Sequence, residues 1–237
     1  MKQTLLTFLF GASLLASCRK ENIDIPATPE EPCIEQTANP AGRSYTSDSV
    51  VAYNCTSKHC GFMPLSSKNY WVYEDSVFTD GIFAKVQYDT LRYSTNWKSL
   101  TDDLVWWESN ISVGLPEKLY ANDSAFYSLQ DRMFIPGYMD ARKDFSLFPG
   151  DSLRYLSNFD DLMAAGRSLK LKTAVSSPAG NFTDCLYFEK NARNYRKDQV
   201  FFKPGLGVIK YIKEMAPPGS PFIKLQQVST LISYHLE

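Results

Sequence analysis

The 237-residue sequence predicts an all-β fold, a curved antiparallel sheet or open half-barrel with only a minor helical contribution. From residue 70 onward, long runs of apolar and polar residues alternate with the period of two that marks half-buried strands. Turns containing Gly or Pro separate these runs at the spacing of antiparallel hairpins. The composition, 44% hydrophobic and 14% aromatic, supplies enough apolar surface for the core of a single domain.

The first predicted strands cover residues 70–78 and 82–93, which alternate between apolar and polar positions. They meet at Asp80-Gly81, where glycine supplies the positive φ of a tight hairpin turn. Residues 104–111 are rich in aromatic side chains and form the next predicted strand. This half of the domain is therefore expected to begin as an antiparallel meander.

The segment 113–165 is harder to assign, because Pro and Gly residues divide it into short apolar pieces, and 159–165 is consistent with one or two helical turns. Alternation returns in the C-terminal third, with Pro204-Gly205 as a type II turn. There Gly207 allows a neighbouring aromatic ring to cross its strand closely. A total of nine to eleven strands is expected. The C-terminal strands are expected near residues 169–175, 182–190, 200–203, 206–213 and 222–236.

The N-terminus has the features of a secretory signal peptide. Lys2 is followed by an uncharged, apolar run over residues 4–16, which is too short to span a bilayer permanently. The run ends in Leu15-Ala16-Ser17-Cys18, which resembles the lipobox of bacterial lipoproteins. The resemblance implies that residues 1–17 are removed and that Cys18 receives a diacylglycerol with palmitate-type acyl chains. Such chains would anchor the protein to a membrane.

Residues after Cys18 bear on location and domain organisation. Arg19 stands where Asp would favour retention in the inner membrane, so the resemblance implies the outer membrane. Lys20-Glu21 is similar to a short signal for the cell surface, which leaves the periplasmic face and the surface both open. Four prolines make 18–48 a flexible tether. A single β-rich domain is then expected at 49–237.

Four further cysteines suggest disulfides, because an even number in an exported chain usually pairs. Three pairings are open, and the sequence does not choose among them. The alternative is a metal bound by Cys55, His59 and Cys60, but the spacing departs from that of zinc sites. No metal and no cofactor are therefore expected. The four cysteines are Cys33, Cys55, Cys60 and Cys185.

Enzyme activity is not expected. His59 and His235 are the only histidines, and neither lies in a nucleophile–base pattern. The sequence contains no phosphate-binding loop, dinucleotide fingerprint or metalloprotease motif. A net charge of −1 gives no reason to expect nucleic acid as a partner. The expected partners are the membrane, through the anchor, and an apolar ligand or an envelope protein.

Aromatic residues are the candidate ligand contacts, since the chain holds 15 Phe, 14 Tyr and 4 Trp. Trp106 and Trp107 are consecutive, so on a strand they face opposite ways. One of them, or Trp97, could line a pocket or stack on a sugar. The alternative is a sheet that buries both rings of the Trp pair.

A triplet of Asp, then Ser or Thr, then an apolar residue recurs five times. It resembles the O-glycosylation acceptor of some Gram-negative bacteria, although Asp and Ser also open strands and turns readily. The resemblance implies sugar on at least one acceptor hydroxyl. The five acceptors are Ser49, Ser76, Thr90, Ser124 and Ser152.

Several short motifs resemble those of uncharacterised bacterial outer-membrane lipoproteins with a half-barrel domain, as in lipoprotein carriers. They are Trp71-Val72-Tyr73, the string from Pro178 to Cys185, and the Lys203-Pro204-Gly205-Leu206-Gly207 turn. The resemblance implies a lipid-anchored binding module for an apolar ligand. Two alternatives stay open: a structural or protein-interaction lipoprotein with a filled core, and a glycan-binding accessory protein that uses its Trp residues.

Overall fold

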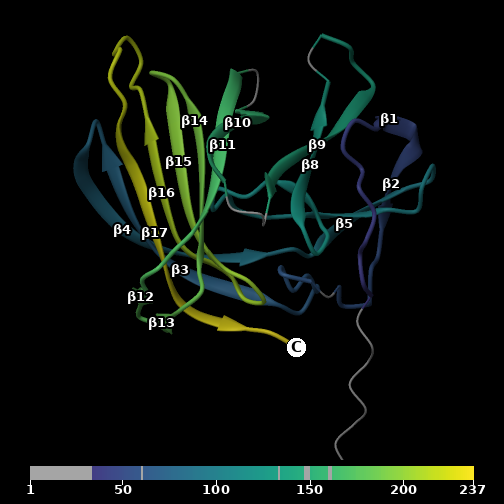
Figure 1. Cartoon of the computed structure of the whole chain (residues 1–237), viewed down its shortest axis with the longest axis horizontal. Helices are drawn as coiled ribbons and strands as arrows, with labels where there is room; N and C mark the ends of the chain where they lie inside the picture. Colours follow the sequence, from purple (N-terminus) through teal and green to yellow (C-terminus); the bar gives the residue numbers. More distant parts are fainter. Residues whose placement is uncertain (1–33, 60, 133, 147–149, 160–161) are drawn as a thin grey trace, which may run out of the picture. The chain divides into compact units, whose positions relative to one another are not determined.

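The computed structural model describes residues 34–59, 61–132, 134–146, 150–159 and 162–237, with the side chains of 150–163 excepted. Two antiparallel sheets lie against each other, the eight-stranded sheet at the left and the seven-stranded sheet at the right of Figure 1. A short hairpin completes the β-structure. No helix in these segments is long and apolar enough to cross a bilayer.

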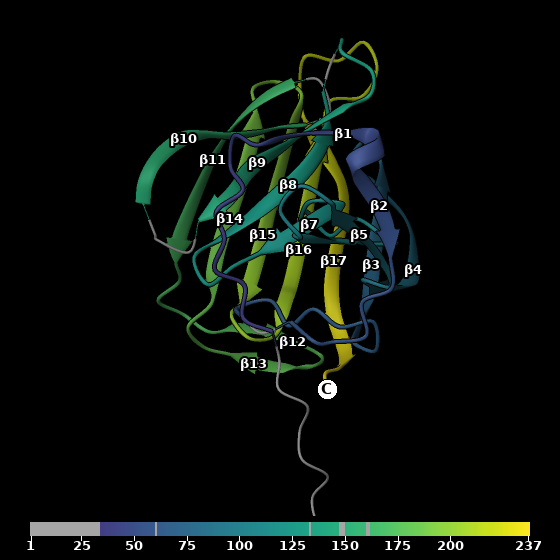
Figure 2. The same ribbon diagram turned by 90° about the vertical axis from the view of Figure 1, so that its right-hand side faces the viewer.

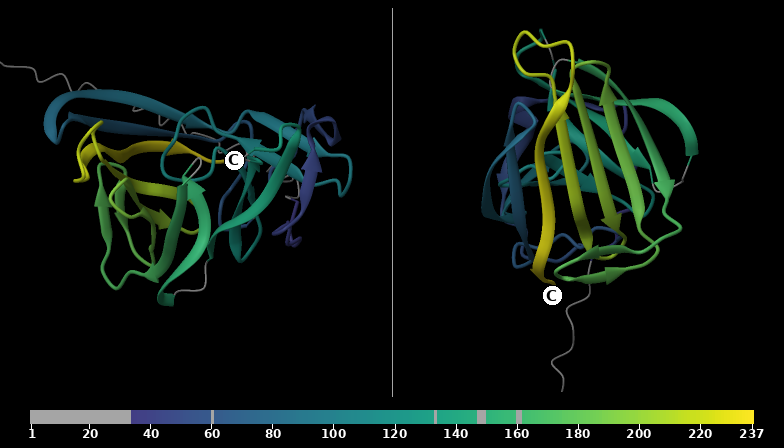
Figure 3. Two further views of the ribbon diagram at one scale, coloured as in Figure 1. Left: turned by 90° about the horizontal axis from the view of Figure 1, so that it is seen from above. Right: turned by 90° about the vertical axis from the view of Figure 1, so that its left-hand side faces the viewer.

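The eight-stranded sheet has the order β10-β11-β14-β15-β16-β17-β3-β4, and its broad face is seen in Figure 3, right. Its strands are β3 (Tyr70–Thr79), β4 (Ile82–Arg92), β10 (Gly150–Phe159), β11 (Leu162–Lys170), β14 (Leu186–Ala192), β15 (Arg196–Lys203), β16 (Gly207–Met215) and β17 (Lys224–His235). The separate hairpin consists of β12 (Val175–Ser177) and β13 (Gly180–Phe182).

The seven-stranded sheet curls until its two edges meet. Its order is β1-β9-β8-β7-β6-β5-β2, and the 3-10 turn η1 (Ser47–Ser49) joins the two edge strands directly (Figure 2). Because only three residues separate its first and last strands in the chain, the sheet must curve until these two edges lie near each other, although β1 and β2 do not pair. The strands are β1 (Ser44–Thr46), β2 (Val50–Tyr53), β5 (Thr95–Ser99), β6 (Val105–Glu108), β7 (Lys118–Ala121), β8 (Ala125–Asp131) and β9 (Tyr138–Ser146).

Two apolar cores follow from this curl. The interior of the curled sheet holds Trp106 against Tyr45 and Tyr120, with ring centroids 6.2 and 5.7 Å away. The opposite face of the same sheet packs on the eight-stranded sheet, where Phe126 meets Phe202 at 5.3 Å. The central strands β6, β7 and β8 of the seven-stranded sheet are therefore largely buried on both faces, whereas the edge strand β2 is mostly exposed.

The face that the eight-stranded sheet turns toward its partner changes character along the strands. One end of this inner face is apolar, and the opposite end carries a row of charged and polar side chains. Because directly opposed residues on neighbouring strands share a face, the register fixes the rows. The apolar row includes Leu186, Phe202, Leu231 and Tyr73; the middle row is Phe188, Val200, Tyr211, Ser229 and Asp75; the polar row is Lys190, Asp198, Lys213 and Gln227.

The predicted fold class is confirmed, and every pairing between strands is antiparallel. The hairpin at Asp80-Gly81 and the turn at Pro204-Gly205 form as expected. A Cβ on Gly207 would lie 3.0 Å from the Trp71 indole nitrogen, which confirms the close crossing predicted there. The helical interpretation of 159–165 is wrong, because Phe159 ends β10 and Leu162 begins β11.

The ordered domain begins earlier than the composition indicated. Residues 34–48 were assigned to the tether, yet β1 pairs with β9, and Ile34 forms a bridge with His59. Pro40 is buried. A proline-rich segment can join a sheet at its edge, where it needs few hydrogen bonds to a neighbouring strand. The domain therefore includes residues 34–48.

Candidate functional site

A cleft of about 700 Å³ lies between the two sheets, at the polar end of the inner face. The loop between β6 and β7 covers one side, and β8 and β9 supply part of a wall. Strands β14, β15 and β16 contribute the charged row described above. A cleft of this volume is large enough for a ligand of drug-like size.

A β-bulge places the first charged group in the cleft. Phe145 pairs with Phe126 and Lys143 with Tyr127, so Asp144 is an extra residue without a partner on β8. Bulges of this kind re-aim a side chain within a strand. The Asp144 carboxylate, 1% exposed, lies 3.3 Å from the Lys190 ammonium on β14. One buried ion pair thus connects the two sheets across the cleft.

A second ion pair lies on the eight-stranded sheet alone. Arg196 donates two hydrogen bonds to Asp198, from Nε at 2.9 Å and from Nη2 at 2.7 Å. Burial lowers the pKa of Arg196, but the hydrogen bond and charge of Asp198 outweigh it and raise that pKa. Burial also raises the pKa of Tyr211, the neighbour of Asp198 on β16. Arg196 therefore keeps its positive charge near neutral pH.

Two polar atoms in the cleft lining have unused bonding capacity. Within the described residues, Ser128 Oγ has no hydrogen-bond partner, and Asp144 Oδ1 has only its ion pair with Lys190, although both side chains are almost completely buried. A buried polar group without a partner costs about 1–3 kcal/mol. Such groups are rare in folded proteins and call for an explanation, for example a bound ligand or water.

The loop over the cleft is held in place at several points. Asn110 donates from Nδ2 to the Thr90 carbonyl at 2.8 Å, and its Oδ1 accepts from the Arg92 amide at 2.7 Å. Val113 and Leu115 are buried in the apolar core. Between them, Gly114 packs directly on Val200 and Tyr211. The cleft is therefore preformed rather than closed by a loose lid.

The tryptophans expected to contact a ligand do not line this cleft. Trp106 and Trp107 are fully buried, one in each core, because both faces of their sheet are covered. Trp97 is half-buried; its indole donates to Glu108 at 2.6 Å, and the Lys118 ammonium lies 5.2 Å from its ring centre. The expectation of an exposed Trp in a ligand site is wrong for Trp106 and Trp107.

Cys55 and His59 meet in the apolar core, where Cys55 Sγ lies 3.5 Å from His59 Nε2. Trp107 Nε1 donates to His59 Nδ1 at 3.2 Å, and the Gln36 amide contacts the same atom. An indole N–H can only donate, so Nδ1 is the acceptor and Nε2 carries the proton. Nε2 therefore cannot take the thiol proton, and it cannot ligate a metal without losing its own.

The expected oxidation of all four cysteines is wrong for two of them. In the described segments Cys55 and Cys185 have free, buried thiols. Cys33 and Cys60 lie outside the described residues, and a bond between these two is the one pairing still open. We expect thiol labelling of the denatured, unreduced protein to modify Cys55 and Cys185 only. Four labels would reject the remaining disulfide, and no labels would contradict the free thiols.

The stability of the protein should fall on acidification because of His59. Burial lowers the pKa of His59 from 6.5 to about 4, so the unfolded chain binds a proton at higher pH than the folded one. The contribution is complete above pH 6.5 and is lost as pH falls toward 4. It amounts to about 3 kcal/mol at most. Urea unfolding between pH 8 and pH 4 measures it.

Asp75 acts in the opposite sense, so the control for His59 must remove it. Burial, and then the neighbouring Asp89, raise the pKa of Asp75 from 3.8 to about 6. Its contribution to stability is complete below pH 3.8 and is lost as pH rises through 6. In Asp75→Asn, the acid-induced loss should therefore be steeper than in the parent. A further change of His59→Gln should flatten the profile, whereas His235→Gln should not.

The remaining predicted modification sites are only partly described. Ser49, Ser76, Thr90 and Ser124 are each partly exposed. The side chain of Ser152 lies outside the described residues, as does Cys18. Glycosylation and lipidation therefore stay predictions.

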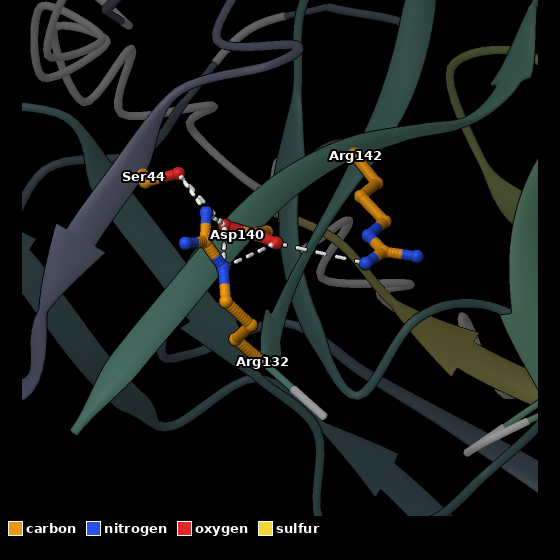
Figure 4. A network of polar contacts seen from close by, with 4 residues as sticks. All are labelled: Ser44, Arg132, Asp140 and Arg142. Carbon is orange, nitrogen blue, oxygen red and sulfur yellow. Dashed lines mark hydrogen bonds and ion pairs between the residues drawn. The ribbon is translucent and has the colours of Figure 1, made fainter. Parts of the chain in front are cut away.

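A polar network on the outside of the curled sheet contrasts with the cleft. Arg132 donates to Asp140 from Nη2 at 2.6 Å and from Nε at 3.1 Å, and its Nη2 also donates to Ser44 (Figure 4). Arg142 lies 3.6 Å from the same carboxylate. These side chains are 17–35% exposed. Water screens them, so each pair stabilises the fold by at most about 1 kcal/mol.

The sequence does contain a signal for the cleft. On β14, Lys190 is two residues from the buried Phe188, so both side chains point to the same face of the sheet. On β15, Asp198 likewise shares a face with the buried Val200 and Phe202. A charged residue on a face that is otherwise apolar marks the end of the core and the start of a polar site. Asp144 gave no such signal, because its direction depends on the bulge.

No protein-family model and no curated protein matches the chain. A solved structure, described as a candidate lipoprotein from Parabacteroides distasonis, is similar with a TM-score of 0.38 and 12% identity. The similarity covers 74% of this chain and 98% of that chain.

Proposed function

We propose that this chain is an exported binding protein that holds a small polar ligand in the cleft between its two sheets. The observation that supports it is the buried Ser128 hydroxyl, which has no hydrogen-bond partner among the described residues, in a preformed cleft of about 700 Å³ that also holds the Asp144–Lys190 ion pair. A ligand that supplied a donor or an acceptor there would remove the cost of burying that hydroxyl.

An apolar ligand is less well supported. The aromatic rings between the sheets pack on one another, as Phe145 does on Phe188 at 4.8 Å. They fill the apolar half of the space, while the cleft lies in the polar half. A glycan site built on tryptophan has no support either, since Trp106 and Trp107 are enclosed.

The protein binds without catalysis in this proposal. The proton on His59 Nε2 faces Cys55, so this histidine does not act as a base toward the thiol. In the cleft, the Asp144 and Asp198 carboxylates each form an ion pair with a basic side chain.

Native mass spectrometry of the full chain, purified from its own host, tests the proposal. We expect a co-purified small polar molecule that is lost from the variant Ser128→Tyr, whose ring would occupy the cleft. Folding of the variant is checked by circular dichroism. A parent protein that carries no adduct and binds none from a host metabolite extract would contradict the proposal.

A lipid anchor on Cys18 completes the proposed function and holds the domain at the outer membrane. In Cys18→Ala, we expect the protein to lose the lipid and to be either left unprocessed, with residues 1–17 attached, or released, because the acylated residue directs cleavage in lipoproteins. Ser17→Ala, which keeps a small residue before the cut, should behave as the parent does. An anchored, correctly processed Cys18→Ala protein would contradict the lipobox assignment.

A further inference from the structure

The charges around the cleft are balanced. Its lining contains four acidic and four basic side chains, drawn from both sheets. Transfer of a net charge into a partly desolvated site is unfavourable unless an opposite charge meets it. Since the cleft brings no net charge of its own, it favours a ligand whose own charges sum to zero.

The lining also limits what kind of neutral ligand fits. None of its residues is aromatic, so no ring is present on which a pyranose could stack. Apolar side chains in the lining are few, namely Ile111, Leu115, Pro116 and Leu129. That is too little apolar surface for an acyl chain. Eight charged side chains are also more than uncharged hydroxyl groups would need.

We infer that the ligand is a short zwitterion, a peptide-like molecule with a free ammonium and a free carboxylate. This inference rests on the proposed function. The ammonium lies against Ser128 Oγ, which has no hydrogen-bond partner in the described structure, and beside the Asp144 carboxylate, whose lone pairs can accept more hydrogen bonds than Lys190 supplies. The carboxylate faces Lys118 on β7 and Lys213 on β16, which belong to opposite sheets.

Calorimetric titration of the full chain in mild detergent, with trialanine as probe, tests the inference. The matched probe is N-acetyl-trialanine amide, which has the same backbone and no charges, and maltotriose represents an uncharged polyol. We expect trialanine to bind at least tenfold more tightly than the blocked peptide and the sugar. Charge-assisted hydrogen bonds at both ends account for the difference.

Two variants assign the ends of the ligand. Ser128→Ala removes a hydroxyl without a partner in the described structure, so the variant should fold as well as the parent. Its affinity for trialanine should be about fivefold lower. Lys118→Gln should lower the affinity for trialanine by a similar factor and leave the affinity for the blocked peptide unchanged. Its control is Lys98→Gln: Lys98 lies on the same sheet over the ring of Tyr53, outside the cleft.

The outcomes separate this inference from the proposed function. Equal affinity for trialanine and the blocked peptide, or tighter binding of maltotriose, would overturn the inference of a zwitterionic ligand. The proposed function, binding of a small polar ligand, would still stand. Failure of all three probes also overturns the inference, and native mass spectrometry then decides the proposed function independently. If neither Ser128→Ala nor Lys118→Gln affects trialanine binding, the peptide binds outside this cleft and the inference is wrong.

Discussion

Replacement of Asp144 by Asn should lower the free energy of unfolding by about 3–5 kcal/mol, because it removes the negative charge that faces the buried Lys190 ammonium. Lys190 is 8% exposed, and the Asp144 carboxylate lies 3.3 Å from it. Chemical denaturation monitored by fluorescence measures the loss. The loss should appear as a lower midpoint with an unchanged slope.

The control for this prediction lies four residues earlier on the same strand. Asp140→Asn removes a carboxylate that takes part in two partly exposed ion pairs of the network in Figure 4, and should cost about 2 kcal/mol or less. The double variant Asp144→Leu with Lys190→Met should recover most of the lost stability, since apolar side chains can replace a buried ion pair. Equal losses for Asp144→Asn and Asp140→Asn would contradict the buried pair.

Gly114→Ala should be nearly as damaging, with a loss of about 3–4 kcal/mol from two sources. The added Cβ would lie 2.5 Å from Val200 Cγ2 and 2.7 Å from two ring atoms of Tyr211. Overpacking of this kind costs about 1–3 kcal/mol. The backbone of Gly114 also has a φ of +81°, which adds about 1–2 kcal/mol for a residue with a side chain.

A second glycine separates the two contributions. Gly219 has a φ of +78°, and no atom lies within 4 Å of the position that an added Cβ would take, so Gly219→Ala shows the backbone cost alone. Thermal unfolding of both variants gives the difference due to overlap. Because Gly114 lies in the loop that covers the cleft, Gly114→Ala should also weaken ligand binding, whereas Gly219→Ala should not. Equal destabilisation by the two changes would contradict the tight packing of this loop.

Strands that are exposed on one face could be predicted from the alternation of apolar and polar residues in the sequence, whereas strands that are buried on both faces could not. Tyr70–Thr79 alternates between buried and half-exposed positions, and the sequence pattern reveals it. In contrast, Ala125–Leu129 on β8 is buried at every position, because one face meets the eight-stranded sheet and the other the interior of the curled sheet. Without alternation, the segment 113–165 gave no strand signal.

The candidate site was less predictable than the fold for a related reason. Lys190 and Asp198 could be recognised as charged residues at core positions, but their partners could not. Asp144 reaches Lys190 only because a bulge turns its side chain and because the two sheets pack together. The strands that carry the two residues, β9 and β14, are far apart in the sequence. The tryptophans attracted the functional interpretation because of their size. Burial of Trp106 and Trp107 on opposite faces shows that their role is to fill two cores.

The edge strand β1 gives the protein a defined response to mechanical load. If Cys18 anchors the chain, tension along the tether reaches the domain at Ile34 and then at Ser44, the first residue of β1. When force acts at one end of an edge strand and across its length, the residue pairs that join it to the neighbouring strand break one after another. Ser44 donates to Asp140, and Arg132 donates to both residues, so this network reinforces the pair of β1 and β9 that is loaded first (Figure 4). A weak interaction at equilibrium can therefore set the force at which the curled sheet opens.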